Sequence, residues 1–333
     1  MAIPLIDMAN INGEERAEII AQIKMGCESP GFFQLLNHGI EHSLMDRVKK
    51  VCKEHYELNR KENFNQSLPV ETLNSLIQDE LTGNNTTDPE QIGDMDWEDI
   101  FILNDMQKTD SWPAEPNGFK ETLEEFTGEI YKLAETLLEI ISENLRLEKD
   151  YLKRVLAGGE GPENKPFFGT KVSYYPPCPR PDLITGLRAH TDAGGLILLF
   201  QDDEVPGLQV LSNGEWIDVQ PLRHSIVIDV GDQLEVISGG KYKSAWHRIL
   251  PTKDANRLSV ASYYNPSLNT MVYPAPQLAA SKAEGETKEG GEEELSAYPK
   301  FIFGNYMTVY GEQKYDAKEP RFEAMKELYQ HAC

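Results

Sequence analysis

Three residues in the C-terminal half of the chain have the types and the spacing of a metal-binding set. His190 and Asp192 are two residues apart in a segment expected to be extended, so their side chains point to the same face. His247 lies on a later expected strand. Two neutral imidazoles and one carboxylate leave three of six octahedral positions open, which is the ligand pattern of non-haem Fe(II) oxygenases. An HxD pair alone is a weak signal, but the three residues together predict an Fe(II) site that suits an anionic, chelating substrate.

A second pair of residues supports this prediction. Arg257 and Ser259 follow His247 on the last expected strand, and the period of two places both side chains on one face. A guanidinium beside a hydroxyl can hold a carboxylate or bicarbonate through paired hydrogen bonds. The alternative is an ion pair between Arg257 and one of the many surface acids. The metal-binding set in the same region favours the anion-binding interpretation.

Other enzyme classes lack their signatures. The sequence contains no GxSxG turn, no phosphate-binding P-loop and no GxGxxG segment, which argues against a serine hydrolase, a nucleotide hydrolase and a dinucleotide-binding fold. The remaining histidines have ordinary structural explanations. For example, we interpret His38 as a turn residue that is hydrogen-bonded to the backbone.

The elements that must position these residues are mainly short strands. From Gly169 onward apolar residues recur at every second position, and turn residues separate the apolar segments. We expect strands at residues 170–175, 196–201, 207–211, 215–219, 225–229, 233–237, 245–250 and 258–264. Strands of this number and length are typical of an antiparallel barrel or jelly roll.

Helices are expected on both sides of this β-rich region. Apolar residues recur at a spacing of three and four within residues 17–27 and, most clearly, within 119–145. Further elements are expected as short strands at 3–6 and 32–36 and as helices at 43–58, 300–310 and 321–331. The predicted fold class is therefore mostly β with flanking helices: a double-stranded β-helix, or jelly-roll, core wrapped by N-terminal and C-terminal helices.

Two polar segments interrupt this pattern. Residues 65–95 contain turn-prone polar stretches, and we interpret them as a mobile surface segment with one short helix at 69–81. Residues 281–296 contain six Glu and two Lys among Gly, Ala and Ser and predict a disordered acidic loop. We therefore divide the chain into a helix-rich N-terminal region (1–165), the jelly-roll core (166–275) and an acidic loop with C-terminal helices (276–333).

The charge balance excludes several classes of function. The chain has 333 residues, with 55 acidic and 32 basic side chains and a net charge of -23. Phosphate backbones and anionic lipids repel such a chain, so we expect no nucleic-acid partner and no membrane-surface role. The longest apolar runs are strand-sized and no basic stretch followed by an apolar core opens the chain, so we expect neither a membrane helix nor a signal peptide.

The cysteines indicate the compartment. The chain has four, Cys27, Cys52, Cys178 and Cys333, and no two of them form a CxxC pair. This spacing fits free thiols in a reducing compartment. We therefore expect a soluble, cytoplasmic protein that acts on a small molecule, as a monomer or a weak homo-oligomer.

The order of these motifs resembles a known superfamily. HxD, a distal His and RxS on a β-rich C-terminal half resemble the plant Fe(II)/2-oxoglutarate-type dioxygenases, as does the segment 31–40. Segments 186–195, 199–203 and 231–237 resemble one branch, the 1-aminocyclopropane-1-carboxylate oxidases. Segment 318–326 is especially specific, because generic 2-oxoglutarate hydroxylases end differently. Together the resemblance covers about residues 1–60, 95–275 and 297–330.

The resemblance implies a reaction. Fe(II) bound by His190, Asp192 and His247 would convert 1-aminocyclopropane-1-carboxylate and O2 to ethylene, CO2 and cyanide, with ascorbate as reductant and bicarbonate as activator. One alternative is a 2-oxoglutarate-dependent Fe(II) dioxygenase that hydroxylates a plant specialised metabolite, with Arg257 holding the 2-oxoglutarate carboxylate. Another is a metal-free barrel that binds a small ligand.

The resemblance also implies further site residues. Arg257 and Ser259 match the pair that binds carboxylate or bicarbonate, and Lys171 and Arg321 match basic positions needed for activator or reductant. Residues at matching positions with less specific roles in substrate or activator binding are Tyr175, Arg188, Gln201 and Lys243. Tyr174 departs from the family, which has asparagine there, and its alternation with Tyr175 predicts that it points away from the iron.

Overall fold

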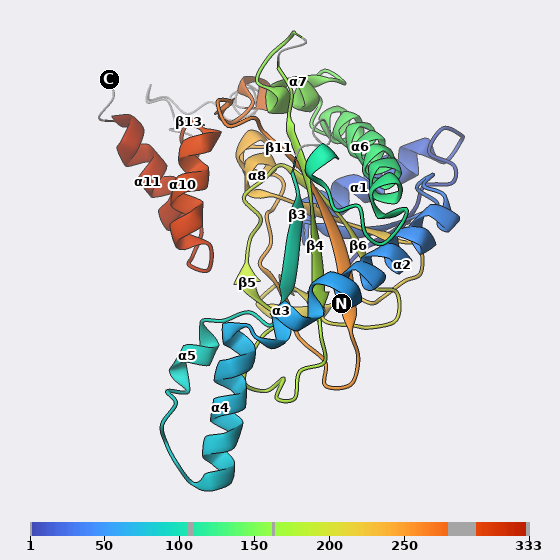
Figure 1. Cartoon of the computed structure of the whole chain (residues 1–333). Coiled ribbons are helices and arrows are strands. Elements are labelled where there is room, and N and C mark those ends of the chain that lie inside the picture. Colours follow the sequence, from blue (N-terminus) through green and yellow to red (C-terminus); the bar gives the residue numbers. More distant parts are fainter. Residues whose placement is uncertain (1, 105–108, 162–163, 279–297, 331–333) are drawn as a thin grey trace.

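Two β-sheets form the core of the molecule (Figure 1), and the computed structural model describes residues 2–104, 109–161, 164–278 and 298–330. The larger sheet contains, in spatial order, β1 (Leu5–Asp7), β2 (Phe32–Leu36), β9 (Ile226–Val230), β6 (Leu196–Gln201), β11 (Arg257–Asn265), β4 (Phe167–Tyr175) and β3 (Asp99–Leu103). The smaller sheet contains β5 (Leu187–His190), β10 (His247–Ile249), β7 (Leu208–Ser212) and β8 (Glu215–Asp218). This arrangement confirms the predicted jelly-roll fold with flanking helices.

Helices cover the outer face of the larger sheet because its strands alternate in polarity. The covering helices are α1 (Arg16–Glu28), α2 (His42–Asn59) and α6 (Phe119–Asn144). On β6, for example, Leu198 and Phe200 belong to the large apolar cluster shared with α6, and on β11 Leu258 and Val260 belong to the same cluster. Burial of such side chains contributes about 1.5–3 kcal/mol each. The outer face therefore holds the sheet in place and leaves the inner face for other residues.

The inner face of the same strands is largely polar. The alternate residues of β4 and β11, Lys171, Tyr175, Arg257 and Ser259, point into the space between the two sheets, because their neighbours in sequence pack against the helices. The strands are paired so that Arg257 lies opposite Tyr175. A second, smaller apolar cluster closes the rest of this interior.

Most predicted elements are confirmed, but residues 233–237 are not a strand. They belong to the helix α8 (Asp232–Ile237), in which every residue is buried. A short, fully buried apolar run has no periodicity that separates a strand from a helix. Strands β3 and β5, which were not predicted, complete the two sheets.

The polar segment 65–95 is more regular than predicted. It contains the helix α4 (Leu68–Thr82) and the short helix α5 (Glu90–Gly93), which project from the barrel as an arm (Figure 1). Pro69 lies in the first turn of α4 and Gly83 ends the helix in a left-handed conformation, as is common at helix ends. The predicted acidic loop 281–296 lies outside the described residues.

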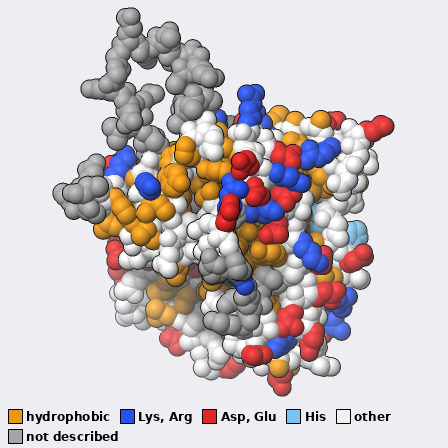
Figure 2. All heavy atoms as spheres, turned by 90° about the horizontal axis from the view of Figure 1, so that it is seen from above, with side chains coloured by type: hydrophobic (Ala, Val, Ile, Leu, Met, Phe, Trp, Pro, Cys, Tyr) orange, Lys and Arg blue, Asp and Glu red, His pale blue; other side chains and the backbone are white. Residues whose placement is uncertain are grey.

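Two helices near the C-terminus complete the described chain. They are α10 (Phe303–Gln313) and α11 (Glu319–Gln330), which lie across the strands from α6 (Figure 1). None of the described helices is long and apolar enough to cross a membrane. On the face drawn in Figure 2, Lys and Arg side chains are interspersed with Asp and Glu rather than gathered into one basic patch. Cys27, Cys52 and Cys178 are free, as predicted, and buried, and Cys333 lies outside the described residues.

Candidate active site

The three predicted metal ligands meet at one end of the smaller sheet. His190 is the last residue of β5 and pairs in register with His247, the first residue of β10. Their rings lie 4.2 Å apart, centre to centre. Asp192 is not on the strand, contrary to prediction. It follows β5 in a loop whose position is fixed by a hydrogen bond from the Asp232 backbone N–H to the Asp192 carbonyl (2.8 Å).

Hydrogen bonds fix which nitrogen of each imidazole is free. The Nδ1 atom of His190 donates to the Arg188 carbonyl at 2.8 Å, and that of His247 donates to the Ala245 carbonyl at 3.2 Å. Because a carbonyl only accepts, the lone pair of each ring is on Nε2. The Nε2 atom of His190 lies 3.5 Å from a carboxylate oxygen of Asp192.

The electrostatics keep His247 and Asp192 in the protonation states that metal ligands need. Burial lowers the pKa of His247 to about 3, so this imidazole is neutral at physiological pH. Burial alone would raise the pKa of Asp192, but the adjacent His190 and His247 side chains outweigh it and hold that pKa below its ordinary value. One donor atom from each of the three residues lies within 4.8 Å of the other two. Two imidazoles and one carboxylate at this spacing fit Fe(II) with open coordination positions.

A buried cation with no ion-pair partner among the described residues lies on the inner face of the larger sheet. Arg257 is only 2% exposed, and its hydrogen bond is to the Gln201 side-chain oxygen, at 3.1 Å. The Nε and Nη1 atoms of Arg257 and the Nε2 atom of Gln201 are buried with no partner among the described residues. Ser259 lies opposite Gln201 in register. Buried donors without acceptors are rare, and this set is complementary to a small carboxylate or bicarbonate.

Lys171 and Tyr175 share one carboxylate. The Nζ atom of Lys171 lies 2.8 Å from Glu98, and the Tyr175 hydroxyl donates to the same carboxylate at 2.6 Å. Burial and the charge of Glu98 raise the pKa of Tyr175 well above its ordinary value, so the phenol keeps its proton. Glu98 was not predicted, because a single glutamate in an acidic chain carries no local signal.

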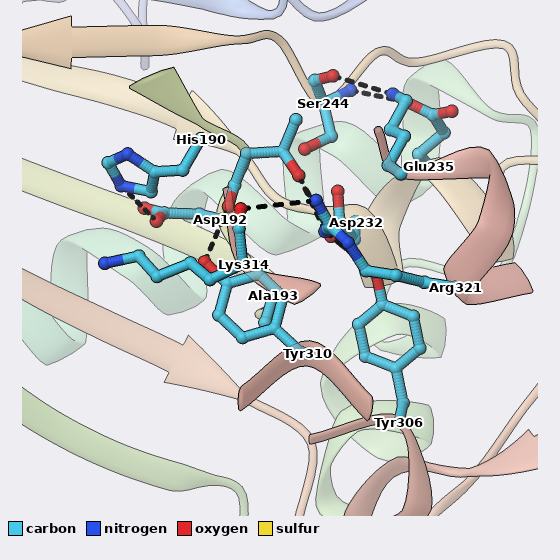
Figure 3. A network of polar contacts seen from close by, with 12 residues as sticks. His190, Asp192, Ala193, Asp232, Glu235, Ser244, Tyr306, Tyr310, Lys314 and Arg321 are labelled. Atoms are coloured by element: carbon cyan, nitrogen blue, oxygen red, sulfur yellow. Dashed lines mark hydrogen bonds and ion pairs between the residues drawn. The ribbon is translucent and has the colours of Figure 1, made fainter. Parts of the chain in front are cut away.

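Lys314 is a second residue that the sequence did not reveal. Its side chain points toward His190 and Asp192 from the end of α10 (Figure 3). Burial lowers its pKa, and the charge of Lys171 lowers it further, so the two lysines approach the same region from opposite elements. Arg188 lies at the edge of this region, with its guanidinium 3.8 Å from the centre of the Tyr315 ring and 3.2 Å from Asp96.

Three predicted features lie elsewhere. Lys243 is exposed, its backbone N–H donates to the Cys27 carbonyl at the end of α1, and within the described residues no hydrogen bond or ion pair joins its side chain to a metal ligand. Arg321 is fully buried in an ion pair behind the ligands rather than among them. Tyr174 points to the outer face, as predicted, and stacks on Tyr56 at 3.7 Å.

The fold and the ligand set define a non-haem Fe(II) oxygenase. The family model of the 2OG-Fe(II) oxygenase superfamily matches residues 169–266, and that of the non-haem dioxygenase N-terminal region, described from morphine synthesis, matches residues 3–121. Among solved structures, JOX2 in complex with 2OG, Fe and JA has a TM-score of 0.75 at 26% identity, covering 98% of this chain and 89% of that one. A rice dioxygenase for auxin oxidation has a TM-score of 0.71 at 20% identity and shows the same fold, covering 96% of this chain and 99% of its own.

Curated relatives narrow the class. A 1-aminocyclopropane-1-carboxylate oxidase of Musa acuminata is 53% identical over 98% of this chain and all of its own length. The 1-aminocyclopropane-1-carboxylate oxidase 5 of Arabidopsis thaliana is 50% identical with the same coverage. The chain belongs to the 1-aminocyclopropane-1-carboxylate oxidase family.

Proposed function

We propose that this enzyme oxidises 1-aminocyclopropane-1-carboxylate with O2 to ethylene, CO2 and cyanide, with ascorbate as reductant and bicarbonate as activator. The observation that carries the proposal is a buried cation, Arg257, which has two donors without partners among the described residues and faces the interior between the two sheets, of which the smaller carries the Fe(II) ligand set. The full-length identity to named oxidases of this type supports it. Bound Fe(II) supplies a redox-active centre at which a chelating amino acid and O2 can be held together.

Side chains of the protein bind and attract the anionic reactants. Arg257, Gln201 and Ser259 offer hydrogen-bond donors for one small anion, either the activator or the substrate carboxylate. Lys171 and Lys314 place two further positive charges beside the metal ligands. Because the chain as a whole is strongly acidic, this local group of cations is what attracts anionic reactants to the site.

The buried position of the ligands supports chemistry shielded from water. His190 is 3% exposed, and Asp192 and His247 are each 8% exposed. Tyr175 keeps its proton and donates to Glu98, which holds Lys171 in place at the wall of the same space. In this arrangement Glu98 orients the lysine and balances its charge, and Arg257 remains available to anions.

Binding measurements can separate this proposal from the 2-oxoglutarate-dependent alternative. We expect 1-aminocyclopropane-1-carboxylate to change the visible absorption spectrum of the Co(II)-loaded protein, because its amine and carboxylate would replace water on the metal. 2-Oxoglutarate at equal concentration should leave the spectrum unchanged.

The control is Lys326→Gln, which removes a surface cation of α11 that pairs with Glu323. This variant should give the spectrum of the unaltered protein with both compounds. A spectral change with 2-oxoglutarate and none with the amino acid would contradict the proposed substrate and favour a hydroxylase.

A further inference from the structure

A fully buried ion pair lies directly behind the metal ligands. Arg321 on α11 and Asp232 at the start of α8 are both 0% exposed, and Nη1 of Arg321 lies 3.0 Å from Oδ2 of Asp232. The same Nη1 donates to the Thr191 hydroxyl oxygen at 3.0 Å. Thr191 is the residue between the ligands His190 and Asp192. The guanidinium is therefore one side chain away from the metal-binding residues (Figure 3).

The two C-terminal helices hold the same segment through a second set of contacts. The Tyr310 hydroxyl of α10 donates to the Thr191 carbonyl at 2.7 Å. The Tyr306 hydroxyl donates to Oδ2 of Asp232 at 2.6 Å. The Nη2 atom of Arg321 donates to the Asp316 carbonyl at 3.0 Å, in the connection between the helices. These bonds join α10, α11 and the ligand loop, which we define as residues 190–194, into one buried unit.

The start of α8 is also hydrogen-bonded to the ligand loop, through backbone atoms. The backbone N–H of Asp232 donates to Asp192, and that of Gln233 donates to Gly194. A Cβ atom added to Gly231 would lie 2.3 Å from the Gly194 carbonyl oxygen, so only glycine permits this approach. Asp232 thus connects the backbone of the metal ligand Asp192 to the guanidinium of Arg321.

Charge compensation distinguishes Arg321 from Arg257. The carboxylate of Asp232 already balances Arg321, whereas among the described residues Arg257 has no carboxylate within ion-pair distance and retains two donors without partners. Arg321 has one such donor, Nε, inside a cluster whose charge is already balanced. An anion that reached Arg321 would have to compete with a buried carboxylate, at a high desolvation cost.

We propose that Arg321 is a positioning residue that fixes the ligand loop through Asp232 and Thr191, and that it does not bind the activating anion. The inference rests on the proposed function in one respect, the identification of that anion as bicarbonate. It predicts that Arg321 acts on metal affinity, because residues that orient metal ligands typically change affinity about 10–100-fold when replaced.

Two measurements on the full-length protein test this proposal. The first is the dissociation constant of Co(II) without substrate, from equilibrium dialysis or calorimetry. The second is the bicarbonate concentration that gives half-maximal activity at saturating Fe(II). The variants are Arg321→Gln and the double variant Arg321→Gln/Asp232→Asn. The double variant removes both charges of the buried ion pair, so neither partner is left buried without its counter-charge and the fold is less destabilised. Tyr310→Phe removes a single hydroxyl from the same unit, and Lys326→Gln on α11 is the surface control.

The expected result separates the two parameters. Both Arg321 variants should bind Co(II) about 10–100-fold more weakly, Tyr310→Phe should show a smaller loss, and Lys326→Gln should show none. The half-saturating bicarbonate concentration should stay the same in all of them once Fe(II) is saturating. Unchanged Co(II) affinity in the double variant and in Tyr310→Phe would overturn the proposal, as would a raised bicarbonate requirement at saturating Fe(II). The Co(II) measurement does not depend on the substrate. It therefore tests the role of Arg321 even if the proposed reaction is wrong.

Discussion

Replacing His190 or Asp192 by alanine is expected to abolish turnover. Each substitution removes one of three donors that lie within 4.8 Å of one another. Two remaining protein ligands do not hold Fe(II) in a facial arrangement, so the loss should exceed the roughly 10–100-fold that typically follows loss of a residue that only orients a ligand. The measurements are metal content after dialysis against Fe(II) and ethylene formation at saturating substrate.

A matched histidine variant controls for side-chain loss alone. His42 is exposed at the start of α2 and stacks on His224, away from the metal ligands. His42→Ala should retain both metal content and activity. Substantial turnover by His190→Ala or Asp192→Ala would contradict the assignment of the metal site.

Arg257→Ala is expected to raise the half-saturating concentration of the anion that this residue binds by about 10–100-fold. A hydrogen bond to a charged group contributes about 1.5–3 kcal/mol, and each ~1.4 kcal/mol corresponds to a factor of ten. Activity should be titrated separately with bicarbonate and with the amino acid substrate. The titration that shifts identifies which of the two anions lies on the guanidinium.

Two further arginine variants sharpen this test. Arg257→Lys keeps the charge but loses the planar fork, so its defect should lie between those of the unaltered protein and the alanine variant. Arg248→Ala removes an arginine of β10 whose side chain lies over the Trp216 ring and bonds Gln209, and it should leave both titrations unchanged. If Arg257→Ala shifts neither titration, the anion site is wrongly assigned.

The alternation of side chains between the two faces of a strand explains why much of the site could be predicted. Alternation along β4 and β11 places Lys171, Tyr175, Arg257 and Ser259 on the interior face, while the intervening apolar residues face the helices. The prediction for the metal ligands depended on residue type and order. It also placed Asp192 on the same strand as His190, which is wrong, but the loop in which Asp192 lies still brings its carboxylate to within 3.5 Å of Nε2 of His190.

The local sequence pattern could not predict site residues that come from distant segments of the chain. Glu98 directly precedes β3 and Lys314 directly follows α10, so both are far from β4 and β5 in sequence, and neither has neighbours of a recognisable motif. Helix α8 was predicted as a strand because all of its residues are buried and no periodicity remains. Lys243 and Arg321 are basic residues in the expected segments, but sequence alone does not reveal whether a cation is exposed or already paired. The structure shows that Lys243 is exposed and that Asp232 balances Arg321.

The most direct test of the proposed reaction is headspace gas chromatography on the purified protein. The mixture contains Fe(II), ascorbate, bicarbonate, O2 and 1-aminocyclopropane-1-carboxylate, without 2-oxoglutarate. We predict ethylene from the unaltered protein and none from His247→Ala. Absence of ethylene, together with succinate formation once 2-oxoglutarate is added, would contradict the account and assign the enzyme to the hydroxylases.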